Sequence, residues 1–294
     1  MESDDFVIGP YDSAWAAALS AGWRAAQPEQ SLTARELDNR CRALLQLDGR
    51  IWVVTAAGQA VGMALAAPLP GLPGLCELDG FIAPAWQRRG WGGQLLLHAK
   101  RDLQGTAVRQ LTHAITDRQS AAAQFLFKHH FAVEHEEWLL TMPQLTASPP
   151  PVVPGLTWGT LPRAQALTRF CELYDRAFAG FPWYQPYTPS EVAAELVAAH
   201  DLLFLQRDGA LIGAAWLRWP EPNLGQIEPM GIVAEEQGKG YGRYLLALAL
   251  HQLAERGARR AQIGTWAQNK TAVSLYQSVG FRQQETITYL ACDL

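Results

Sequence analysis

The sequence QGKGYG, residues 237–242, lies between an apolar run and a long helical pattern, YLLALALHQLAERG. A second stretch, QRRGWG at residues 87–92, occupies the same kind of place earlier in the chain. A strand, a glycine-rich turn and a helix in succession present unpaired backbone N–H groups at the positive end of a helix dipole. Because glycine lets the backbone approach a ligand closely, both stretches predict anion-binding turns.

The spacing of the two stretches indicates an internal repeat. Gln87 and Gln237 differ by 237 − 87 = 150 positions, and Phe131 and Phe281 by 281 − 131 = 150, so the register holds without a gap between them. Two copies of one fold explain this regularity. Further matched pairs are Ile82 with Ile232, Gly90 with Gly240, and Leu103 with Leu253.

A proline-rich segment separates the two copies. Residues 143–155, PQLTASPPPVVPG, contain little that can join a helix or a sheet interior, so they predict a stiff, partly extended linker. A chain of 294 residues is long enough for two domains. We therefore expect an N-terminal domain at 1–145, a linker at 146–154 and a C-terminal domain at 155–294.

Each half has the same expected order of elements, β, α, α, β, β, β, α, β, α, β, which is typical of a mixed α/β domain. Hairpin turns are expected at Ala57-Gly58 and Asp208-Gly209, and capping boxes from Thr33 to Glu36 and from Thr188 to Glu191. The other expected elements are helices 12–26 and 162–178, strands 77–82 and 226–233, strands 110–116 and 261–265, helices 120–128 and 270–278, and strands 136–141 and 285–290.

Composition and charge restrict the class of partner. The formal net charge of −4 leaves no basic surface for nucleic acid or anionic lipid, so neither nucleic acid nor a membrane is expected as a partner. The acidic start, MESDDFVIGPYDSAW, and the absence of a span-length apolar run favour a cytoplasmic protein. The four cysteines form no CxxC pair, which favours buried thiols and no metal site.

The charges in the turns suit phosphate oxygens: Lys239 in the second half, and Arg88 with Arg89 in the first. The turn is not a Walker loop, since no Ser or Thr follows Gly-Lys, and not a dinucleotide fingerprint, since Leu245 stands at the third glycine position. A tight connection that needs positive φ is the alternative. Duplication of the glutamine, two glycines and the helix favours a ligand site.

Both halves resemble the GNAT superfamily of acyl-CoA-dependent N-acyltransferases, whose signature is Gln/Arg-x-x-Gly-x-Gly/Ala between strand four and helix three. The resemblance covers nearly the whole chain. It implies two tandem α/β domains, each with a mixed, mostly antiparallel central sheet flanked by helices, and acetyl-CoA as cosubstrate without a metal. It also implies that the turn amides hold the CoA pyrophosphate and that strand four pairs with the pantetheine arm. The implied cofactor-binding residues are Met230, Gly231, Ile232, Val233, Gln237, Gly238, Lys239, Gly240, Tyr241, Gly242 and Asn269, with Ile82, Ala83, Arg88, Arg89, Gly90, Trp91 and Gly92 in the first half.

The second half carries a further family feature, Asn269 followed by Tyr276. The resemblance implies that Asn269 contacts CoA and that Tyr276 lies near its sulfur, where a phenol can protonate the leaving thiolate as a general acid. The alternative for Tyr276 is a core tyrosine. The first half has Gln119, Leu126 and His130 in place of Asn269, Tyr276 and Gly280, so we expect the N-terminal domain to be non-catalytic. Whether it binds acyl-CoA stays open.

Glu228 is the candidate base for the amine. By simple alternation it shares a face of its strand with Met230 and Ile232, although a bulge would change that parity. A water chain to another carboxylate, or a solvated glutamate without a role, fits the sequence equally well. The aromatic segment 178–187 either walls an acceptor site or packs against the neighbouring domain.

The expected function is therefore direct transfer of acetyl from acetyl-CoA to a primary amine of a small molecule, in the C-terminal domain. A ping-pong route would need an activated cysteine. The alternatives are an acyl-CoA-binding regulatory module without turnover and a protein lysine acetyltransferase. A monomer or weak homo-oligomer is expected, because a tandem chain pairs its domains internally.

Overall fold

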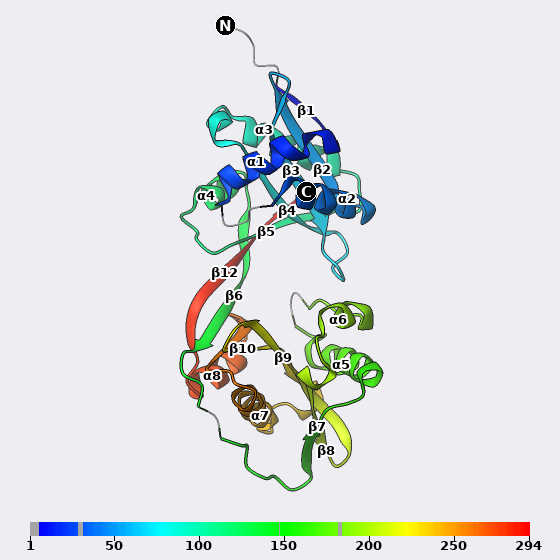
Figure 1. Cartoon of the computed structure of the whole chain (residues 1–294), viewed down its shortest axis with the longest axis vertical. Coiled ribbons are helices and arrows are strands. Elements are labelled where there is room, and N and C mark those ends of the chain that lie inside the picture. The colour runs from blue at the N-terminus through cyan, green and yellow to red at the C-terminus, as the bar shows by residue number, and fades with distance from the viewer. Residues whose placement is uncertain (1–5, 29–31, 147, 182–183) are drawn as a thin grey trace. The chain divides into compact units, whose positions relative to one another are not determined.

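The computed structural model describes residues 6–28, 32–146, 148–181 and 184–294, and the chain forms two compact units (Figure 1). The N-terminal unit comprises residues 1–134 and 288–294, and the C-terminal unit comprises residues 135–287. Each unit has a mixed, mostly antiparallel sheet flanked by helices, which confirms the predicted fold class.

The elements follow the expected order in both repeats. The first repeat contains β1 (Val7–Pro10), α1 (Ala16–Ala26), α2 (Ala34–Gln46), β2 (Arg50–Ala56), β3 (Gln59–Pro68), β4 (Leu75–Ile82), α3 (Trp91–Leu103), β5 (Gln110–Ile115), α4 (Ala121–Lys128) and β6 (Ala132–Met142). The second contains β7 (Leu156–Gly159), α5 (Arg163–Phe178), α6 (Pro189–Glu195), β8 (Leu202–Arg207), β9 (Ala210–Glu221), β10 (Leu224–Ile232), α7 (Tyr241–Glu255), β11 (Arg260–Trp266), α8 (Lys270–Ser278) and β12 (Arg282–Asp293).

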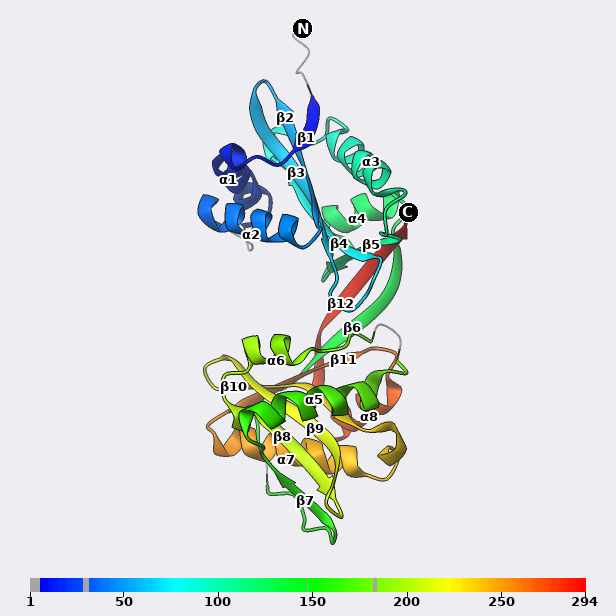
Figure 2. The same ribbon diagram turned by 90° about the vertical axis from the view of Figure 1, so that its right-hand side faces the viewer.

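Each sheet is antiparallel except for one pair of parallel strands. The strand order is β1-β2-β3-β4-β5-β12 in the N-terminal unit and β6-β11-β10-β9-β8-β7 in the C-terminal unit. The parallel neighbours are β4 with β5 and β10 with β11. Figure 2 shows α1 and α2 on one face of the N-terminal sheet and α3 and α4 on the other. In the C-terminal unit, α5 and α6 cover one face, and α7 and α8 the other (Figures 1 and 2).

The closing strands are exchanged between the repeats. β12 pairs with β5 from Thr288 opposite Ile115 to Asp293 opposite Gln110, while β6 pairs with β11. The compact units therefore differ from the expected linear domains 1–145 and 155–294. The closing strands of the two repeats have similar lengths and follow equivalent helices, so no local feature of the sequence distinguishes their partners.

Local signals in the sequence determine the turns and helix starts. Thr33 and Thr188 each form the predicted capping box with a glutamate three residues later. Ala57 and Asp208 have φ values of 47° and 50°, and a positive-φ glycine follows each, which matches the predicted two-residue hairpins. These features fix the register of β2 with β3 and of β8 with β9.

The cores are apolar and aromatic. In the C-terminal unit Phe170, Phe204 and Trp216 are at most 1% exposed and lie among the strands and α5. Burial of each such ring contributes about 1.5–3 kcal/mol to the free energy of unfolding. All four cysteines are buried free thiols, as predicted.

His135, at the start of the C-terminal unit, makes stability depend on pH. It is 7% exposed, and burial lowers its pKa from 6.5 to about 4. Between these values the unfolded chain binds this proton and the folded chain does not, so the stabilising contribution is complete above pH 6.5 and is lost as the pH falls toward 4. We expect His135→Gln to flatten the dependence of the free energy of unfolding on pH between 7 and 4.5, measured by urea titration. Equal slopes in both proteins would contradict this assignment.

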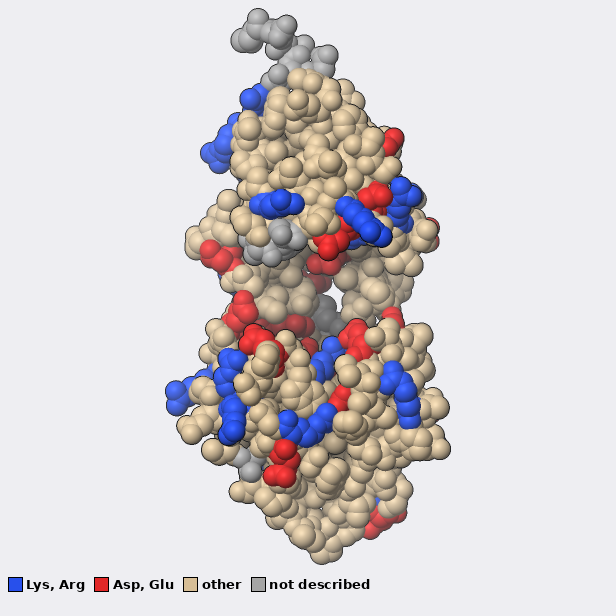
Figure 3. Space-filling model, in the orientation of Figure 1, with Lys and Arg blue, Asp and Glu red and all other residues tan. Residues whose placement is uncertain are grey.

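The described helices include none that is long and apolar enough to cross a bilayer. Figure 3 shows basic and acidic side chains interspersed over the face in view.

Candidate active site

The parallel strands β10 and β11 part in the middle of the C-terminal sheet. They pair only where Leu224–Ile227 lies beside Arg260–Ile263. Beyond this point β10 continues its pairing with β9, and β11 continues its pairing with β6. An opening therefore separates residues 228–232 of β10 from residues 264–266 of β11.

The edge of β10 that borders the opening offers backbone groups. The Val233 amide donates to the Ile212 carbonyl at 2.9 Å, so alternation turns the N–H and C=O of Ile232 and Met230 away from β9 and toward the opening. The Ile232 carbonyl accepts a hydrogen bond from the Gln237 side chain at 2.8 Å. No side chain of the described residues bonds to the Met230 backbone. An extended ligand that carries amide groups can therefore add at this edge.

The glycine turn lies directly after this strand. Gly238 and Gly240 have φ values of +73° and +86°, which an L side chain rarely adopts, and α7 begins at Tyr241. The first helical amide to donate back is that of Tyr244, to Gly240 O at 3.2 Å. The amides before it have no partner within the helix, which suits an anion. The structure thus supports both interpretations of the turn, the positive-φ connection and the anion site.

Lys239 and Arg89, next to the two turns, already have partners within the chain. Lys239 Nζ donates to Glu236 Oε2 at 3.0 Å, and Arg207 Nη1 lies 3.1 Å from the same carboxyl group. In the N-terminal unit the guanidinium of Arg89 lies over the rings of Trp86 and Trp91, 4.8 and 5.4 Å from their centroids. A phosphate contact from Lys239 would therefore compete with Glu236.

Tyr276 lies on α8 and is 5% exposed. Burial, and second the charge of Glu228, raise the pKa of its phenol well above the usual value near 10, so the group keeps its proton at neutral pH. Its hydroxyl makes no hydrogen bond within the described part of the chain. The backbone carbonyl of Tyr276 accepts a hydrogen bond from the Phe281 amide at 3.1 Å. The backbone carbonyl of Leu126 accepts one from the Phe131 amide at the same distance, so Leu126 is the N-terminal counterpart of Tyr276.

Asn269 caps α8, and its side-chain oxygen accepts from the Ala272 amide at 3.1 Å. The matching cap of α4 is Ser120, whose hydroxyl accepts from the Ala123 amide at 3.2 Å. The expected match of Gln119 with Asn269 is therefore wrong at the level of structure. α4 begins one position later relative to the repeat register, so the capping role passes to the next residue.

Glu228 lies at the border of the opening between β10 and β11. Its carboxyl atoms are 3.5 Å from the position that a Cβ on Gly264 of β11 would take. Burial is the main cause of the raised pKa of Tyr276, on α8, and of Tyr187, which packs against α5, and the charge of Glu228 adds to both shifts. Glu228 is exposed and also accepts a hydrogen bond from Gln226. The carboxylate can thus reach a ligand from the α5 side.

The expected face of Glu228 is wrong, because the strand bulges next to it. Ile227 pairs with Leu217 and Met230 with Ala215, so two residues of β10, Glu228 and Pro229, oppose the single residue Trp216 of β9. Met230 therefore shares a face with Ile227 and not with Glu228. Pro229 was the available signal, since proline inside a strand marks a bulge or an edge.

The described rings of the aromatic segment 178–187 pack against rings of their own unit. Tyr187 lies against Phe170 and Tyr174 of α5 and Trp216 of β9, and Phe181 lies 5.4 Å from Trp266 of β11. Trp183, also part of this segment, lies outside the described residues. The rings thus cover the α5 face of the opening.

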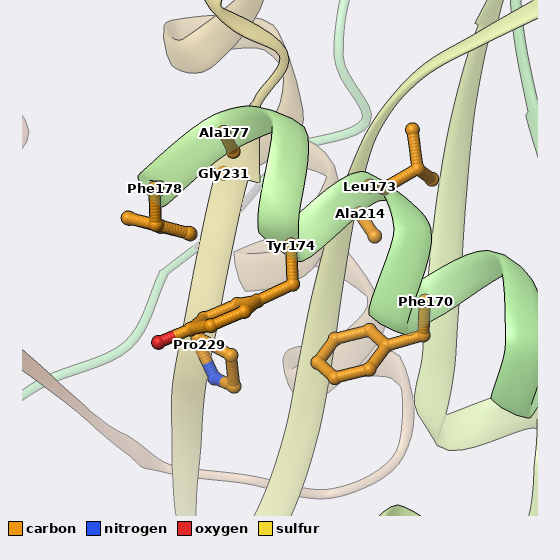
Figure 4. Close-up of a pocket in the computed structure, with 8 residues that line it drawn as sticks. All are labelled: Phe170, Leu173, Tyr174, Ala177, Phe178, Ala214, Pro229 and Gly231. Atoms are coloured by element: carbon orange, nitrogen blue, oxygen red, sulfur yellow. The ribbon is translucent and has the colours of Figure 1, made fainter. Parts of the chain in front are cut away.

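A small cavity lies beneath these rings, between α5 and the strands β9 and β10 (Figure 4). Its volume of about 10 Å³ is enough for one water molecule. A Cβ on Gly231 would lie 2.6 Å from the Phe178 ring, so glycine is required where α5 crosses the strand. The lining residues are Phe170, Leu173, Tyr174, Ala177, Phe178, Ala214, Pro229 and Gly231.

Sequence reasoning missed Tyr174 and Trp266, which complete the aromatic cover. Trp266 ends its strand, and a large aromatic residue at a strand end next to the opening was a usable signal. In the described ranges no group of three His, Cys, Asp or Glu side chains is placed to hold a metal ion.

Comparison with known proteins agrees with this architecture. The Acetyltransferase (GNAT) family matches residues 167–281, and the Acetyltransferase (GNAT) domain matches residues 47–133. A mycothiol acetyltransferase from Cellulomonas flavigena is 30% identical over 218 residues, which cover 68% of this chain and 62% of the relative. A mycothiol acetyltransferase from Thermomonospora curvata is 29% identical over 250 residues, 82% of this chain and 79% of the relative.

Among solved structures, a GCN5-related N-acetyltransferase from Sphaerobacter thermophilus shares the fold with a TM-score of 0.67 and 18% identity, over 98% of this chain and 95% of that one. One GNAT match in each repeat, together with the repeated strand, glycine turn and helix, identifies the chain as a tandem member of the GNAT family of acetyltransferases.

Proposed function

We propose that the C-terminal unit transfers an acetyl group from acetyl-CoA directly to a primary amine of a small molecule. The observation that carries this proposal is the opening between β10 and β11, which Glu228 borders and which lies next to a glycine turn suited to phosphate. The charge of Glu228 also contributes to the raised pKa of the buried Tyr276 phenol. The names of the two relatives support a small-molecule acceptor.

In the proposed reaction the amine nitrogen attacks the thioester carbon, and a C–N bond replaces the C–S bond. Glu228 takes the proton that the amine loses, and Tyr276 donates its proton to the departing thiolate. The arm of CoA lies along the Met230 edge, and its pyrophosphate lies at the amides near Gly240. The acceptor enters from the α5 side, which the exposed Glu228 carboxylate faces.

Direct transfer is supported by the state of the thiols. Burial raises the pKa of Cys171, on α5 of the same unit, to about 11, and that of Cys41 to about 11. A thiol with such a pKa is protonated at neutral pH and is a poor nucleophile. A ping-pong route through either residue is therefore disfavoured.

The test is release of free thiol from acetyl-CoA by the full chain, against small amines, lysine peptides and the acceptor of mycothiol acetyltransferases. We expect turnover with a small amine and little with the peptides. Preference for peptides would support a protein acetyltransferase instead. Binding of acetyl-CoA without turnover on any amine would support a regulatory module, and absence of both would overturn the proposal.

Loss of the Gln237 bond is expected to weaken donor binding. In Gln237→Leu the turn loses its link to the Ile232 carbonyl, a bond worth about 1 kcal/mol, so KM for acetyl-CoA should rise about five-fold with little change in kcat. Gln87→Leu removes the equivalent 2.8 Å bond to the Ile82 carbonyl and is the matched control, because KM reports only the unit that does chemistry. An equal rise in KM for both variants would contradict the assignment of the site to the C-terminal unit.

A further inference from the structure

The N-terminal unit repeats the parting of parallel strands but differs in what borders it. β4 and β5 pair only where residues 75–77 lie beside residues 110–112, and β5 continues along β12. The turn beyond is also repeated, since Arg88 and Gly90 have φ values of 65° and 84°. By backbone conformation alone, both units would have a site for the same ligand.

The polar groups that face the two openings can be identified from the register. The Ala83 amide donates to the Val61 carbonyl at 2.8 Å, so alternation turns the backbone of Leu78, Gly80 and Ile82 away from β3 and toward the N-terminal opening. The repeat register matches Gly80 with Met230. These two residues therefore hold the same place on the edges of β4 and β10.

Side chains of the N-terminal unit already occupy that edge. Asp79 Oδ1 accepts from the Gly80 amide at 2.7 Å, and Gln27 Nε2 donates to the Gly80 carbonyl at 3.3 Å. His113 Nδ1 lies 2.7 Å from the Leu78 carbonyl and must be the donor, because a carbonyl oxygen only accepts. His113 comes from β5, so its ring bridges the two strands at the point where they part.

The C-terminal unit lacks these seals. Pro229 stands at the repeat position of Asp79, and its side chain has no hydrogen-bond acceptor. Ile263 stands at the repeat position of His113, and its side chain cannot donate. The backbone of Met230 receives no hydrogen bond from a side chain in the described residues. The CoA arm is an extended chain with amide groups, which needs unpaired strand-edge groups. In the N-terminal unit it would have to displace three hydrogen bonds.

We infer that the chain holds one acyl-CoA, in the C-terminal unit, and that Gln27, Asp79 and His113 seal the N-terminal opening against the pantetheine arm. This inference rests on the proposed use of acetyl-CoA. It differs from the expectation that both turns are cofactor sites. The N-terminal unit keeps the turn, including the Gln87 bond to the strand, as a connection between β4 and α3.

The experiment is titration calorimetry of the full chain with acetyl-CoA, for wild type, Gly240→Asp and Gly257→Asp. Gly240 has φ +86° at the start of α7, Gly257 has φ +94° just beyond its end, and neither has atoms within 4 Å of an added Cβ. Both variants therefore add the same charge and the same backbone strain to one helix, at opposite ends. Thermal unfolding of each variant checks that it is folded.

We expect one acetyl-CoA per chain in wild type and in Gly257→Asp, and a Kd at least about a hundred-fold higher in Gly240→Asp, because a carboxylate there repels phosphate. Two acetyl-CoA molecules per wild-type chain would overturn the inference. So would a site of wild-type affinity that remains in Gly240→Asp. Absence of binding in wild type would instead refute the proposed function.

Discussion

Replacing Tyr276 by phenylalanine should lower kcat about a hundred-fold or more while the Kd for acetyl-CoA stays within about two-fold. The variant removes only the hydroxyl, and a positioned general acid contributes about 10²–10⁴ to a rate. The ring keeps its contact with Phe281, at 6.1 Å between centroids, so the fold should be preserved. Pre-steady-state thiol release and calorimetric binding separate the two quantities.

The raised pKa of Tyr276 gives this prediction a pH signature. Burial keeps the phenol protonated beyond its usual range, so wild-type kcat should show no alkaline loss due to this group below about pH 10. Tyr244→Phe, on α7, is the control for loss of a phenol elsewhere in the unit. A Tyr276→Phe enzyme with wild-type kcat would make Tyr276 a core tyrosine.

Glu228→Gln should lower kcat/KM for the amine about a hundred-fold at neutral pH, since the variant can no longer take the amine proton. It must then use amine that has already lost its proton in solution. Its kcat/KM should therefore rise about ten-fold per pH unit below the pKa of the acceptor, while wild type changes less.

Glu172→Gln is the matched control for Glu228→Gln. Glu172 is an exposed carboxylate on α5, and its partner Arg169 is also exposed. A Glu228→Gln enzyme that loses activity but keeps the wild-type pH profile would point to a positioning role. Unchanged activity would favour a base that acts through water from another carboxylate.

The sequence predicts most of the fold because its signals are local. The capping boxes at Thr33 and Thr188 and the hairpin turns each depend on a few neighbouring residues, and the structure has all of them. The repeat register of 150 positions also identifies Tyr276 and Leu126 as equivalent positions of the two repeats. These features need no knowledge of distant contacts.

What could not be predicted depends on contacts between distant positions. Gln27 bonds to Gly80, 53 residues away in sequence, and His113 bonds to Leu78, 35 residues away. Neither contact can be recognised from the residues near it in the sequence. The bulge beside Glu228 changes which side chains share a face, although strict alternation placed Glu228 with Met230. The exchange of the closing strands escapes prediction because the two strands have similar lengths and follow equivalent helices.

The strand exchange also determines which sheet can be completed first while the chain is being synthesised on the ribosome. The N-terminal sheet ends with β12, so residues 1–134 are synthesised long before Thr288–Leu294, which complete their sheet. At about 5–20 residues per second the wait is on the order of ten to thirty seconds. During that time the outer edge of β5 has no native neighbour, and β6 is an edge strand that could add there. Strands β6 to β11 of the C-terminal unit, by contrast, are neighbours in one sheet and all emerge before β12.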